Sequence, residues 1–387
     1  MNVPKLRFKE FNDELNTFKI KDTGNVITGM TPSTADKKNY GSEYLWVSPG
    51  DMGYSKYIAN TKTKLSLKGF NKTRQLPNNS ILVTCIGSTI GKMGMSNSTL
   101  STNQQINSII PTKNFNPNYL YYCINYNFPK FLNKISFQAV PIISKSEFEK
   151  LEIKCTLNLS EQEKIGNMLD LLDKKIELQF KKIEDLKLFK VRTLDRYFNK
   201  NINETRSLLK NYCFCLTGKS KVDKVDMNGK YYIMDMGTVN ADGNILKIKP
   251  TFCNSDLLSY GDLVMPKDDI GGGLIIGKTG FIDEDNKYIL GDHVYLLKTK
   301  DINSLFLHYQ INSRYINRQL KRKVTGSAQL GLKSDNILNQ EIFVYSDNNQ
   351  EIIANIFKLM DKKIELECNE LNKLLEYKKG LMQNMFV

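Results

Sequence analysis

The sequence predicts an α+β protein in which two globular lobes alternate with two long helices, in the order lobe, helix, lobe, helix. Three observations support this prediction: a repeated long helical segment, a fainter repeat of the segments between, and a charge surplus confined to those segments. The helical repeat relates residues 160–198 to residues 348–386 at a constant offset of 188. It includes the identical run Asp-Lys-Lys-Ile-Glu-Leu at 173–178 and 361–366. A self-match of this length defines an internal two-fold repeat.

Both copies of the repeated segment are predicted to be helical. Neither contains proline, and most of their positions hold good helix formers. Ser160, with Glu163 three residues later, is typical of a capping box at a helix start. A helix over residues 160–198 would be roughly 58 Å long at about 1.5 Å per residue. Such a length is unusual for a globular helix and suits a coiled coil.

Apolar residues on the two helices form two stripes. The first stripe, which we call the seam, follows the alternating three- and four-residue spacing of coiled coils. It comprises Leu169, Leu172, Ile176, Ile183 and Leu186, with Phe357, Met360, Ile364, Leu371 and Leu374. It is interrupted at matching polar positions, Gln179 with Glu367 and Lys190 with Lys378.

The second stripe consists of Leu171 and Leu178, repeated as Leu359 and Leu366. One stripe is expected to hold the two helices together, which leaves the other for contact with a partner. The alternative is that both stripes pack under the lobes of the chain itself.

The segments between the helices are predicted to form lobes at residues 1–158 and 200–346, with the helices at 159–199 and 347–387. In the first lobe we expect strands near residues 19–28, 43–47, 80–85, 106–110 and 151–155, and a short aromatic helix over 118–125. The second lobe repeats this order: Thr28-Gly29 returns as Thr217-Gly218, Leu45–Val47 as Tyr232–Met234, Ile106–Ile110 as His293–Leu297, and Leu120–Asn125 as Leu307–Asn312. One plan with two different surfaces indicates one task performed on two targets.

The formal net charge of +14 is concentrated in the lobes. Residues 1–158 hold 20 Lys and Arg against 10 Asp and Glu, and residues 199–346 hold 20 against 16. The helical segments are nearly balanced. Two basic lobes indicate a polyanionic partner such as nucleic acid, and the alternative is a basic surface that only aids solubility. A membrane partner is disfavoured, because the helices lack a basic amphipathic face.

Composition narrows the class of protein further. No run approaches the ~18 apolar residues of a membrane span, and the first residues lack the apolar core of a signal peptide. The seven cysteines are unclustered, and the two histidines lie far from the Cys213 and Cys215 pair. We therefore expect reduced thiols, a cytoplasmic location and no metal site.

Three short motifs resemble parts of catalytic sites but are interpreted as structural. Residues 272–279 match the P-loop pattern, yet a P-loop runs into a helix, whereas residues 274–276 are predicted to be a buried strand before a turn. Asn116–Tyr119 is close to the Asn-Pro-Pro-Tyr of amino-methyltransferases and is predicted to start a helix, with Asn116 as cap and Pro117 in its first position. Asp268-Asp269 is predicted to lie in a solvated loop. The sequence thus predicts no catalytic site.

Taken together, the chain resembles the specificity subunit of type I restriction–modification enzymes over essentially its whole length. The resemblance rests on the order of several motifs: the two Asp-Lys-Lys-Ile-Glu-Leu helices, Pro4–Phe8, Ile27–Gly29 with Leu216–Gly218, Ser101–Gln105 with Gly291–Val294, Gly326–Gln329 and Gly380–Phe386.

The resemblance implies two target-recognition domains of mixed or antiparallel β-sheet with short helices, separated by two antiparallel coiled-coil helices. It implies that each domain reads one half of a bipartite site on double-stranded DNA. It also implies a non-catalytic scaffold, with two methyltransferase subunits docked on the helices and restriction–translocase subunits completing the complex. S-adenosylmethionine, Mg²⁺ and ATP would then be bound by the partner subunits, and no cofactor by this chain.

DNA contacts are predicted at basic and amide side chains of the two lobes, because Lys and Arg bind phosphates while Arg and Gln can pair with guanine and adenine edges. In the first lobe these are Lys62, Lys64, Lys68, Lys72, Arg74, Lys92, Gln138 and Lys145. In the second lobe they are Lys219, Lys221, Lys278, Arg318, Lys321, Arg322, Lys323, Ser327, Gln329 and Lys333.

Two alternatives remain at this point. One is a stand-alone nuclease or methyltransferase, which the missing cofactor motifs disfavour. The other is a coiled-coil adaptor without a DNA role, which the charge distribution disfavours.

Overall fold

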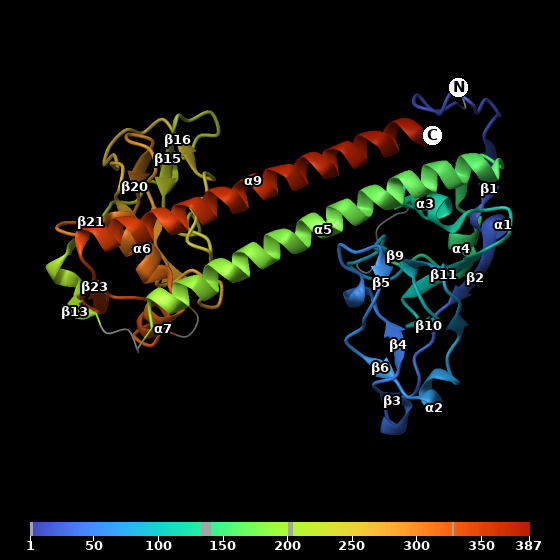
Figure 1. Cartoon of the computed structure of the whole chain (residues 1–387), viewed down its shortest axis with the longest axis horizontal. Helices are drawn as coiled ribbons and strands as arrows, with labels where there is room; N and C mark the ends of the chain where they lie inside the picture. Colours follow the sequence, from blue (N-terminus) through green and yellow to red (C-terminus); the bar gives the residue numbers. More distant parts are fainter. Residues whose placement is uncertain (1–2, 133–140, 200–203, 327–328) are drawn as a thin grey trace. The chain divides into compact units, whose positions relative to one another are not determined.

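The protein is described by a computed structural model that covers residues 3–132, 141–199, 204–326 and 329–387. These residues form two compact units, Met1–Lys182 with Glu367–Val387 and Ile183–Leu366. Each unit contains one lobe and one half of each long helix (Figure 1). The α+β class with two lobes and two long helices is therefore confirmed, and the division between the compact units falls inside the helices.

The two long helices are α5 (Leu159–Tyr197) and α9 (Asp347–Met385), each 39 residues long. The cap of α5 is Asn158, whose Oδ1 accepts from the backbone N–H groups of Ser160 at 3.1 Å and Glu161 at 3.2 Å. The predicted cap Ser160 therefore lies inside the helix, because Asn158 supplies the side-chain oxygen that satisfies its first free N–H groups.

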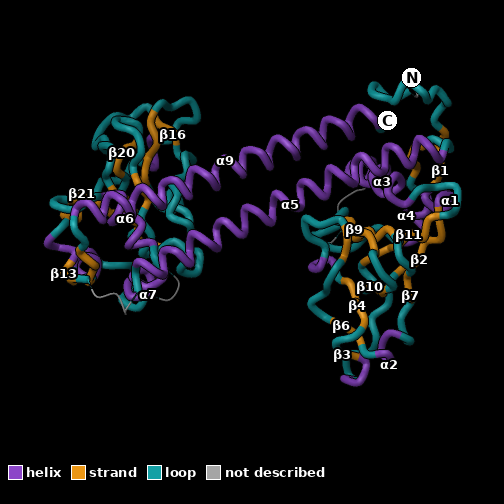
Figure 2. The backbone as a smooth tube through the Cα atoms, in the orientation of Figure 1, coloured by secondary structure: helices purple, strands orange, loops and turns teal. Residues whose placement is uncertain are grey.

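The strands of the first lobe form three sheets within the described residues of its unit (Figure 2). Strand β1 (Asn16–Lys19) pairs with β12 (Glu152–Cys155). One five-stranded sheet has the order β2 (Gly24–Thr28), β11 (Ile106–Pro111), β8 (Ile81–Thr84), β9 (Met93–Ser96) and β5 (Tyr57–Ile58). The other has the order β3 (Tyr40–Gly41), β6 (Lys64–Leu65), β4 (Tyr44–Val47), β10 (Leu100–Thr102) and β7 (Gln75–Leu76).

The strands of the second lobe repeat this topology. Strand β13 (Thr205–Leu208) pairs with β23 (Glu341–Val344), as β1 does with β12. The order β14 (Cys213–Thr217), β21 (Val294–Thr299), β17 (Leu263–Pro266) and β19 (Gly280–Phe281) matches β2-β11-β8-β9. Strand β15 (Tyr231–Met234) lies between β16 (Pro250–Thr251) and β20 (Tyr288–Leu290), and β18 (Asp268–Asp269) pairs with β22 (Leu330–Gly331). The parallel pair β15–β20 corresponds to the parallel pair β4–β10.

Short helices complete each lobe. The first lobe contains α1 (Ile20–Thr23), α2 (Leu67–Phe70), α3 (Pro117–Leu132) and α4 (Lys145–Lys150). The second contains α6 (Ser304–Asn312), α7 (Arg314–Lys321) and α8 (Ser334–Leu338). The predicted start of the aromatic helix is confirmed, because Asn116 Oδ1 accepts from the N–H groups of Asn118 and Tyr119 and Pro117 is the first helical residue.

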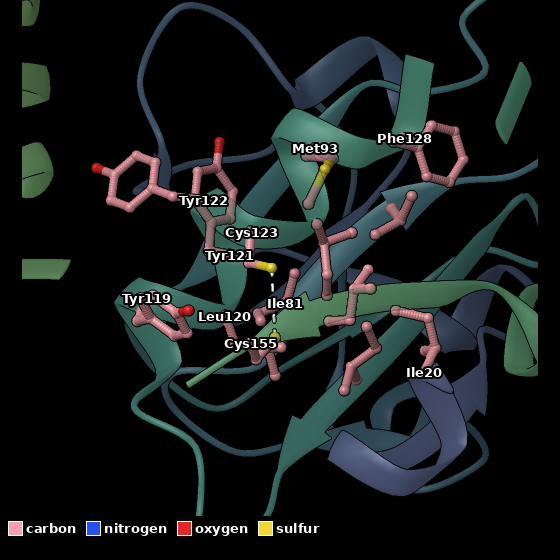
Figure 3. Close-up of a cluster of buried hydrophobic side chains, with 14 of the residues drawn as sticks. Ile20, Ile81, Met93, Tyr119, Leu120, Tyr121, Tyr122, Cys123, Phe128 and Cys155 are labelled. Atoms are coloured by element: carbon pink, nitrogen blue, oxygen red, sulfur yellow. Dashed lines mark hydrogen bonds between the residues drawn. The ribbon is translucent and has the colours of Figure 1, made fainter. Parts of the chain in front are cut away.

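The core of the first unit lies between α3 and the sheet strands, where Tyr119, Tyr122 and Phe128 are buried (Figure 3). In this core the thiols of Cys123 and Cys155 are 3.3 Å apart. The ends of the long helices belong to the same cores: Ile165, Leu169, Met382, Met385 and Phe386 in the first unit, and Leu194, Ile353, Ala354 and Phe357 in the second. Each lobe is thus built onto both long helices.

The two helices pack antiparallel along the seam. In the first unit Asp173 pairs with Lys378, while Gln179 Nε2 donates to Glu367 Oε2 at 2.7 Å. The partner number falls as the residue number rises, which defines the antiparallel direction. The polar positions that interrupt the seam therefore meet polar partners, and buried polar contacts of this kind fix the register of a coiled coil.

Candidate nucleic-acid interface

The same three residue types, a Tyr, an Asp and a Lys, join each lobe to the two helices. In the first unit the Tyr122 hydroxyl donates to Asp173 Oδ2 at 2.7 Å, and Lys378 pairs with Asp173. In the second unit the Tyr309 hydroxyl donates to Asp361 Oδ2 at 2.8 Å, and Lys190 pairs with Asp361. We call each set a Tyr–Asp–Lys junction. Each one links the aromatic helix of a lobe to the Asp of the repeated run on one long helix and to a Lys on the other.

The sequence reasoning noted the repeated Asp and the paired Lys but missed their contacts. The signal was present, because Asp173 with Asp361 and Lys190 with Lys378 both recur at the helix offset of 188. The two tyrosines recur at an offset of 187 and lie in the matching helices α3 and α6. Burial and the neighbouring carboxylate raise the pKa of each Tyr hydroxyl, which therefore stays protonated as a donor.

The first unit has a further buried ion pair beside its junction. Lys56 Nζ pairs with Asp170 and also lies 2.8 Å from Asn118 Oδ1. Burial lowers the pKa of Lys56, and the hydrogen bond to Asp170 offsets part of that effect. Burial alone would raise the pKa of Asp170, but hydrogen bonds from Lys56 and Lys174 outweigh it and lower that pKa. The ion pair thus favours the charged form of Asp170 and offsets part of the cost of burying the Lys56 ammonium group.

The densest basic surface of the second lobe is the helix α7. Ser313 caps it by accepting from the N–H of Ile316, and Ile316 and Leu320 are buried beneath it. Arg314, Arg318 and Lys321 are four and seven residues apart, so they share one helix face. All three are exposed, as is Arg322. Arg314 pairs with Asp195 at 3.4 Å and was missed by the sequence reasoning, although the same spacing could have identified it.

The neighbouring candidate Lys323 is turned toward the protein. Its Nζ donates to the backbone oxygens of Asn336 and Asn339, both at 3.3 Å. Partial burial lowers its pKa. By contrast, Gln329 and Lys333 are exposed at the edge of the same region.

In the first lobe the predicted contacts lie on the surface but several are engaged within the chain. Lys68 and Lys72 both reach Asp36, and Lys145 pairs with Glu149. Arg74 donates to the backbone oxygen of Thr28 at 2.8 Å. Exposed pairs of this kind are weak and can be exchanged for phosphate contacts. Lys62 and Lys92 are exposed, and Lys64 is half-buried.

Two predicted DNA contacts are engaged within the chain: Lys221 is buried and Lys278 is half-buried. Lys221 is 2% exposed, and its Nζ donates to Asp256 Oδ2 at 2.7 Å and to the oxygen of Leu290 at 2.6 Å. Lys278 Nζ donates to the backbone oxygen of Asn312 at 3.0 Å. A surface role predicted from basic residue type alone is therefore wrong for Lys221, whereas the DNA contact of Lys278 stays a prediction. Gln138 and Ser327 lie outside the described residues.

The position of Lys278 in the fold can be tested through the pH dependence of the stability of the second unit. Burial, with Lys321 close by, lowers its pKa to about 8, below the ordinary value of 10.5. The unfolded chain therefore binds more protons between these two pH values, and the native second unit gains stability as pH rises from 8 to 10.5.

Replacing Lys278 with Met is accordingly expected to raise the free energy of unfolding by about 2 kcal/mol at pH 7, after allowance for the lost hydrogen bond. The advantage of the variant over the parent chain should vanish near pH 10.5. Scanning calorimetry at a series of pH values measures this difference, and a pH-independent difference contradicts the assignment.

The motifs considered as catalytic are structural, with two corrections to the sequence prediction. Residues 274–276 form a loop rather than a buried strand, and Leu274 is 63% exposed. Asp269 is 2% exposed and lies in β18 rather than in a solvated loop. The segment runs into the strand β19 and not into a helix, so it lacks the helix N-terminus that a P-loop needs.

A group of possible metal ligands is formed by Asp235, Asp292 and His293. Two of its members have partners outside the group: Asp235 Oδ2 accepts from Lys249 Nζ at 2.7 Å, and His293 Nδ1 lies 2.9 Å from Asp268 Oδ2. Among the described residues, Asp292 Oδ1 is buried without a hydrogen-bond partner. The hydrogen bond with Asp268 raises the pKa of His293.

The seam and the second stripe of the long helices differ sharply in exposure. Seam residues Leu169, Ile176, Ile183, Phe357, Leu371 and Leu374 are buried, while Leu172, Leu186, Met360 and Ile364 are half-buried. In the second stripe Leu171 and Leu178 are 66% and 67% exposed, and Leu359 and Leu366 are 67% and 55% exposed. The seam is thus used inside the chain, whereas the second stripe is open to a partner.

The second stripe also extends further than the sequence analysis recognised. Phe189 and Tyr377, related by the same offset of 188, are exposed as well. Positions seven or eleven residues apart return to within about 20° of one direction on a helix. Phe189 therefore continues the line of Leu171 and Leu178.

Among the described residues no helix is long and apolar enough to cross a membrane, and the cytoplasmic location stays a prediction.

Comparison with known proteins agrees with this architecture. A family model described as the type I restriction modification DNA specificity domain matches residues 12–188 and again residues 212–376. The specificity subunit of the type I restriction enzyme MjaVIII from Methanocaldococcus jannaschii is 25% identical over 412 residues, which cover 97% of this chain and 94% of that subunit. The HindI specificity subunit from Haemophilus influenzae is 34% identical over 139 residues, covering 35% of this chain and 30% of that subunit.

Solved structures show the same fold. The S subunit of a type I restriction-modification system from M. genitalium aligns with a TM-score of 0.68 at 16% identity, covering 100% of this chain and 99% of that one. A chain of a type I R-M system, solved to explain complex assembly and conformational transition, aligns with a TM-score of 0.56 at 11% identity, covering 95% and 96%. The chain therefore belongs to the family of the type I restriction modification DNA specificity domain, and it carries two copies of that domain.

Proposed function

We propose that the chain is the sequence-specific DNA-recognition and scaffold subunit of a type I restriction–modification complex, and that each lobe reads one half of a bipartite site. The observation that carries the proposal is the pair of Tyr–Asp–Lys junctions. They mount two lobes of one topology on the same two helices in the same way. Equivalent mounting of two readers suits a site with two halves at a set spacing.

The surfaces of the two lobes differ, which suits two different half-sites. The second lobe breaks its aromatic helix at Ser313 and adds the basic helix α7, whereas the first lobe continues as the single helix α3 through Pro129. We assign phosphate contacts to Arg318, Lys321 and Arg322 in the second lobe, and to the exposed members of the Lys62–Arg74 segment in the first. Phosphate contacts set the register of a protein on DNA, and other side chains read the bases.

The second stripe is assigned to the methyltransferase subunits, one on each of its two repeated halves. Its exposure and its repetition on a charge-balanced surface support this assignment. Interface cores favour apolar side chains and are depleted in charge. In this arrangement the chain catalyses nothing itself, and the partner subunits bind S-adenosylmethionine, Mg²⁺ and ATP.

Footprinting of the assembled complex on its target DNA tests the proposal. We expect two protected blocks separated by a spacer whose sequence can be changed without loss of binding. One continuous sequence-dependent block contradicts a two-part site. Methylation or cleavage of DNA by the purified chain alone contradicts the non-catalytic role.

The phosphate contacts of α7 predict a change in salt dependence. The triple variant Arg318→Ala, Lys321→Ala, Arg322→Ala should flatten the plot of log affinity against log salt by about 0.9 units for each lost phosphate contact. The reason is that each neutralised phosphate releases condensed counterions. Binding of fluorescent duplex over a series of salt concentrations measures the slope.

The matched control removes three exposed lysines from the long helices, in the variant Lys175→Ala, Lys181→Ala, Lys362→Ala. It changes the net charge by the same amount and is expected to keep the parental slope. Equal slopes for the parent chain and the α7 variant remove α7 from the interface.

A further inference from the structure

The second lobe presents an apolar loop tip to solvent. Residues 270–276 connect β18 to the segment before β19, and Ile270 and Leu274 are 65% and 63% exposed. Exposed apolar patches often mark binding surfaces.

A buried carboxylate accepts hydrogen bonds from backbone N–H groups along this loop. Asp269 Oδ1 accepts from the N–H of Gly271 at 2.6 Å, and its Oδ2 accepts from the N–H groups of Ile275 at 2.9 Å and Ile276 at 3.3 Å. One side chain thus satisfies three backbone donors across the loop. Gly272 and Gly273 between them adopt φ values of +79° and +83°, which side-chain-bearing residues rarely adopt.

The far end of the loop is tied to α7. Asn317 Nδ2 donates to the backbone oxygen of Gly277 at 2.7 Å, and a Cβ at Gly277 would lie 3.2 Å from Leu320. The tip is therefore fixed at both ends before any ligand arrives. A fixed tip binds with little loss of conformational entropy, which favours selective contact over adaptable contact.

Between the loop and α7 lies a hollow of about 410 Å³. The side chains that line it are apolar except for that of Lys321, and the lining comprises Gly272, Gly273, Leu274, Ile276, Lys321, Val324 and Leu330. Gln329, exposed, directly precedes Leu330 at its edge. The hollow thus combines apolar side chains with the ammonium group of Lys321, the last residue of α7.

We infer that Ile270 and Leu274 are base-reading residues of the second lobe, and that they contact the 5-methyl group of thymine in the major groove. This inference rests on the proposed DNA-reading function. Thymine is the base that offers an apolar group on the major-groove edge, and apolar side chains recognise it there. The cations of α7 would hold the flanking phosphates and bring the tip to the bases.

The positive charge near the loop tip favours DNA over a protein as the binding partner. Protein interfaces exclude charge from their cores, as the second stripe does, whereas Leu274 of this tip lines the same hollow as Lys321, and the nearby chain positions Arg318 and Arg322 are exposed. A polyanionic duplex complements that surround. Asp269 touches no base in this scheme and acts as a positioning residue.

The test removes single methyl groups from the DNA. The target sequence is taken from the methylation pattern of the assembled complex, and each thymine of the half-site read by the second lobe is replaced in turn by deoxyuridine, which keeps base pairing. We expect at least one position where the parental complex binds about fourfold to tenfold more weakly, the effect of one or two lost methyl contacts.

The variant Ile270→Ser, Leu274→Ser completes a double-mutant cycle. It should bind the natural site more weakly than the parent and show no further loss on deoxyuridine at that position. The matched control Met227→Ser, Phe252→Ser changes exposed apolar residues elsewhere on the lobe and should keep the parental sensitivity. Because all four residues are exposed, these variants are expected to fold.

Two results overturn the inference. One is equal affinity for thymine and deoxyuridine at every position of that half-site. The other is a loop variant that keeps the deoxyuridine effect but loses a methyltransferase subunit on co-purification, which assigns the tip to a protein. In either case a two-block footprint still supports the proposed function, whereas a single block overturns that function itself.

Discussion

Replacing Leu171, Leu178, Leu359 and Leu366 with Asp is expected to release both methyltransferase subunits while leaving the chain folded. All four side chains are more than half exposed, so the substitutions cost little in the isolated chain. In the complex each Asp would be an unpaired charge in an apolar contact. Residues at the centre of an interface typically contribute about 2 kcal/mol or more each, so four such changes should reduce binding below detection.

Because the stripe is repeated, the prediction can be tested separately for its two halves, one on each long helix. The double variant at Leu171 and Leu178 should retain one methyltransferase subunit, and so should the double variant at Leu359 and Leu366. Mass measurement of the purified complexes by analytical ultracentrifugation reports the stoichiometry. Loss of both subunits from either double variant would show that the two docking faces are not independent.

The control uses exposed polar positions related by the same offset, Lys181→Asp with Asn369→Asp. These variants should keep both partner subunits. If the four-residue stripe variant also keeps both, the docking surface lies elsewhere. A seam variant such as Leu169→Asp should instead unfold the chain, because Leu169 is fully buried in the first core.

The parts of the fold that sequence reasoning predicted correctly are those recorded in local patterns. The long helices follow from periodicity and helix propensity, and the seam separates from the second stripe because the two occupy different helix faces. The repeat then supplied the lobe plan, since the pair β1–β12 returns as β13–β23 and the order β2-β11-β8-β9 returns as β14-β21-β17-β19. The capping residue was misplaced by two positions because Ser160 and Asn158 are both good caps and only the backbone path decides between them.

Contacts between segments far apart in the chain could not be predicted, because sequence periodicity does not encode them. Lys221 and Lys56 have the sequence surroundings of surface lysines, yet each is buried against a carboxylate that lies far away in the chain. Residues 274–276 have the composition of a strand, but Asp269 takes their N–H groups and the preceding glycines turn the chain away from a sheet. In both cases a side chain far along the chain or across a loop overrode local propensity.

Replacing Asp170 with Ala is expected to lower the free energy of unfolding of the first unit by about 4 kcal/mol, the range typical for removing one partner of a buried ion pair. The change would leave the Lys56 ammonium, whose side chain is 2% exposed, without its carboxylate. Lys56 could then stay charged and unpaired or lose its proton, and both outcomes cost free energy. At about 2–4 °C per kcal/mol for a unit of this size, the melting temperature should fall by about 8–16 °C.

The chain reports this transition through its single tryptophan, Trp46, which lies in the first unit. Its fluorescence follows the first unit separately from the second, where the position equivalent to Asp170 is Lys358.

The double variant Lys56→Met, Asp170→Leu should recover most of the lost stability, because a well-packed apolar pair can replace a buried ion pair at little cost. Lys174→Ala removes the exposed partner of Asp170 and should have a small effect. A loss for Asp170→Ala no larger than for Lys174→Ala would mean that the stability of the first unit does not depend on the Lys56–Asp170 ion pair.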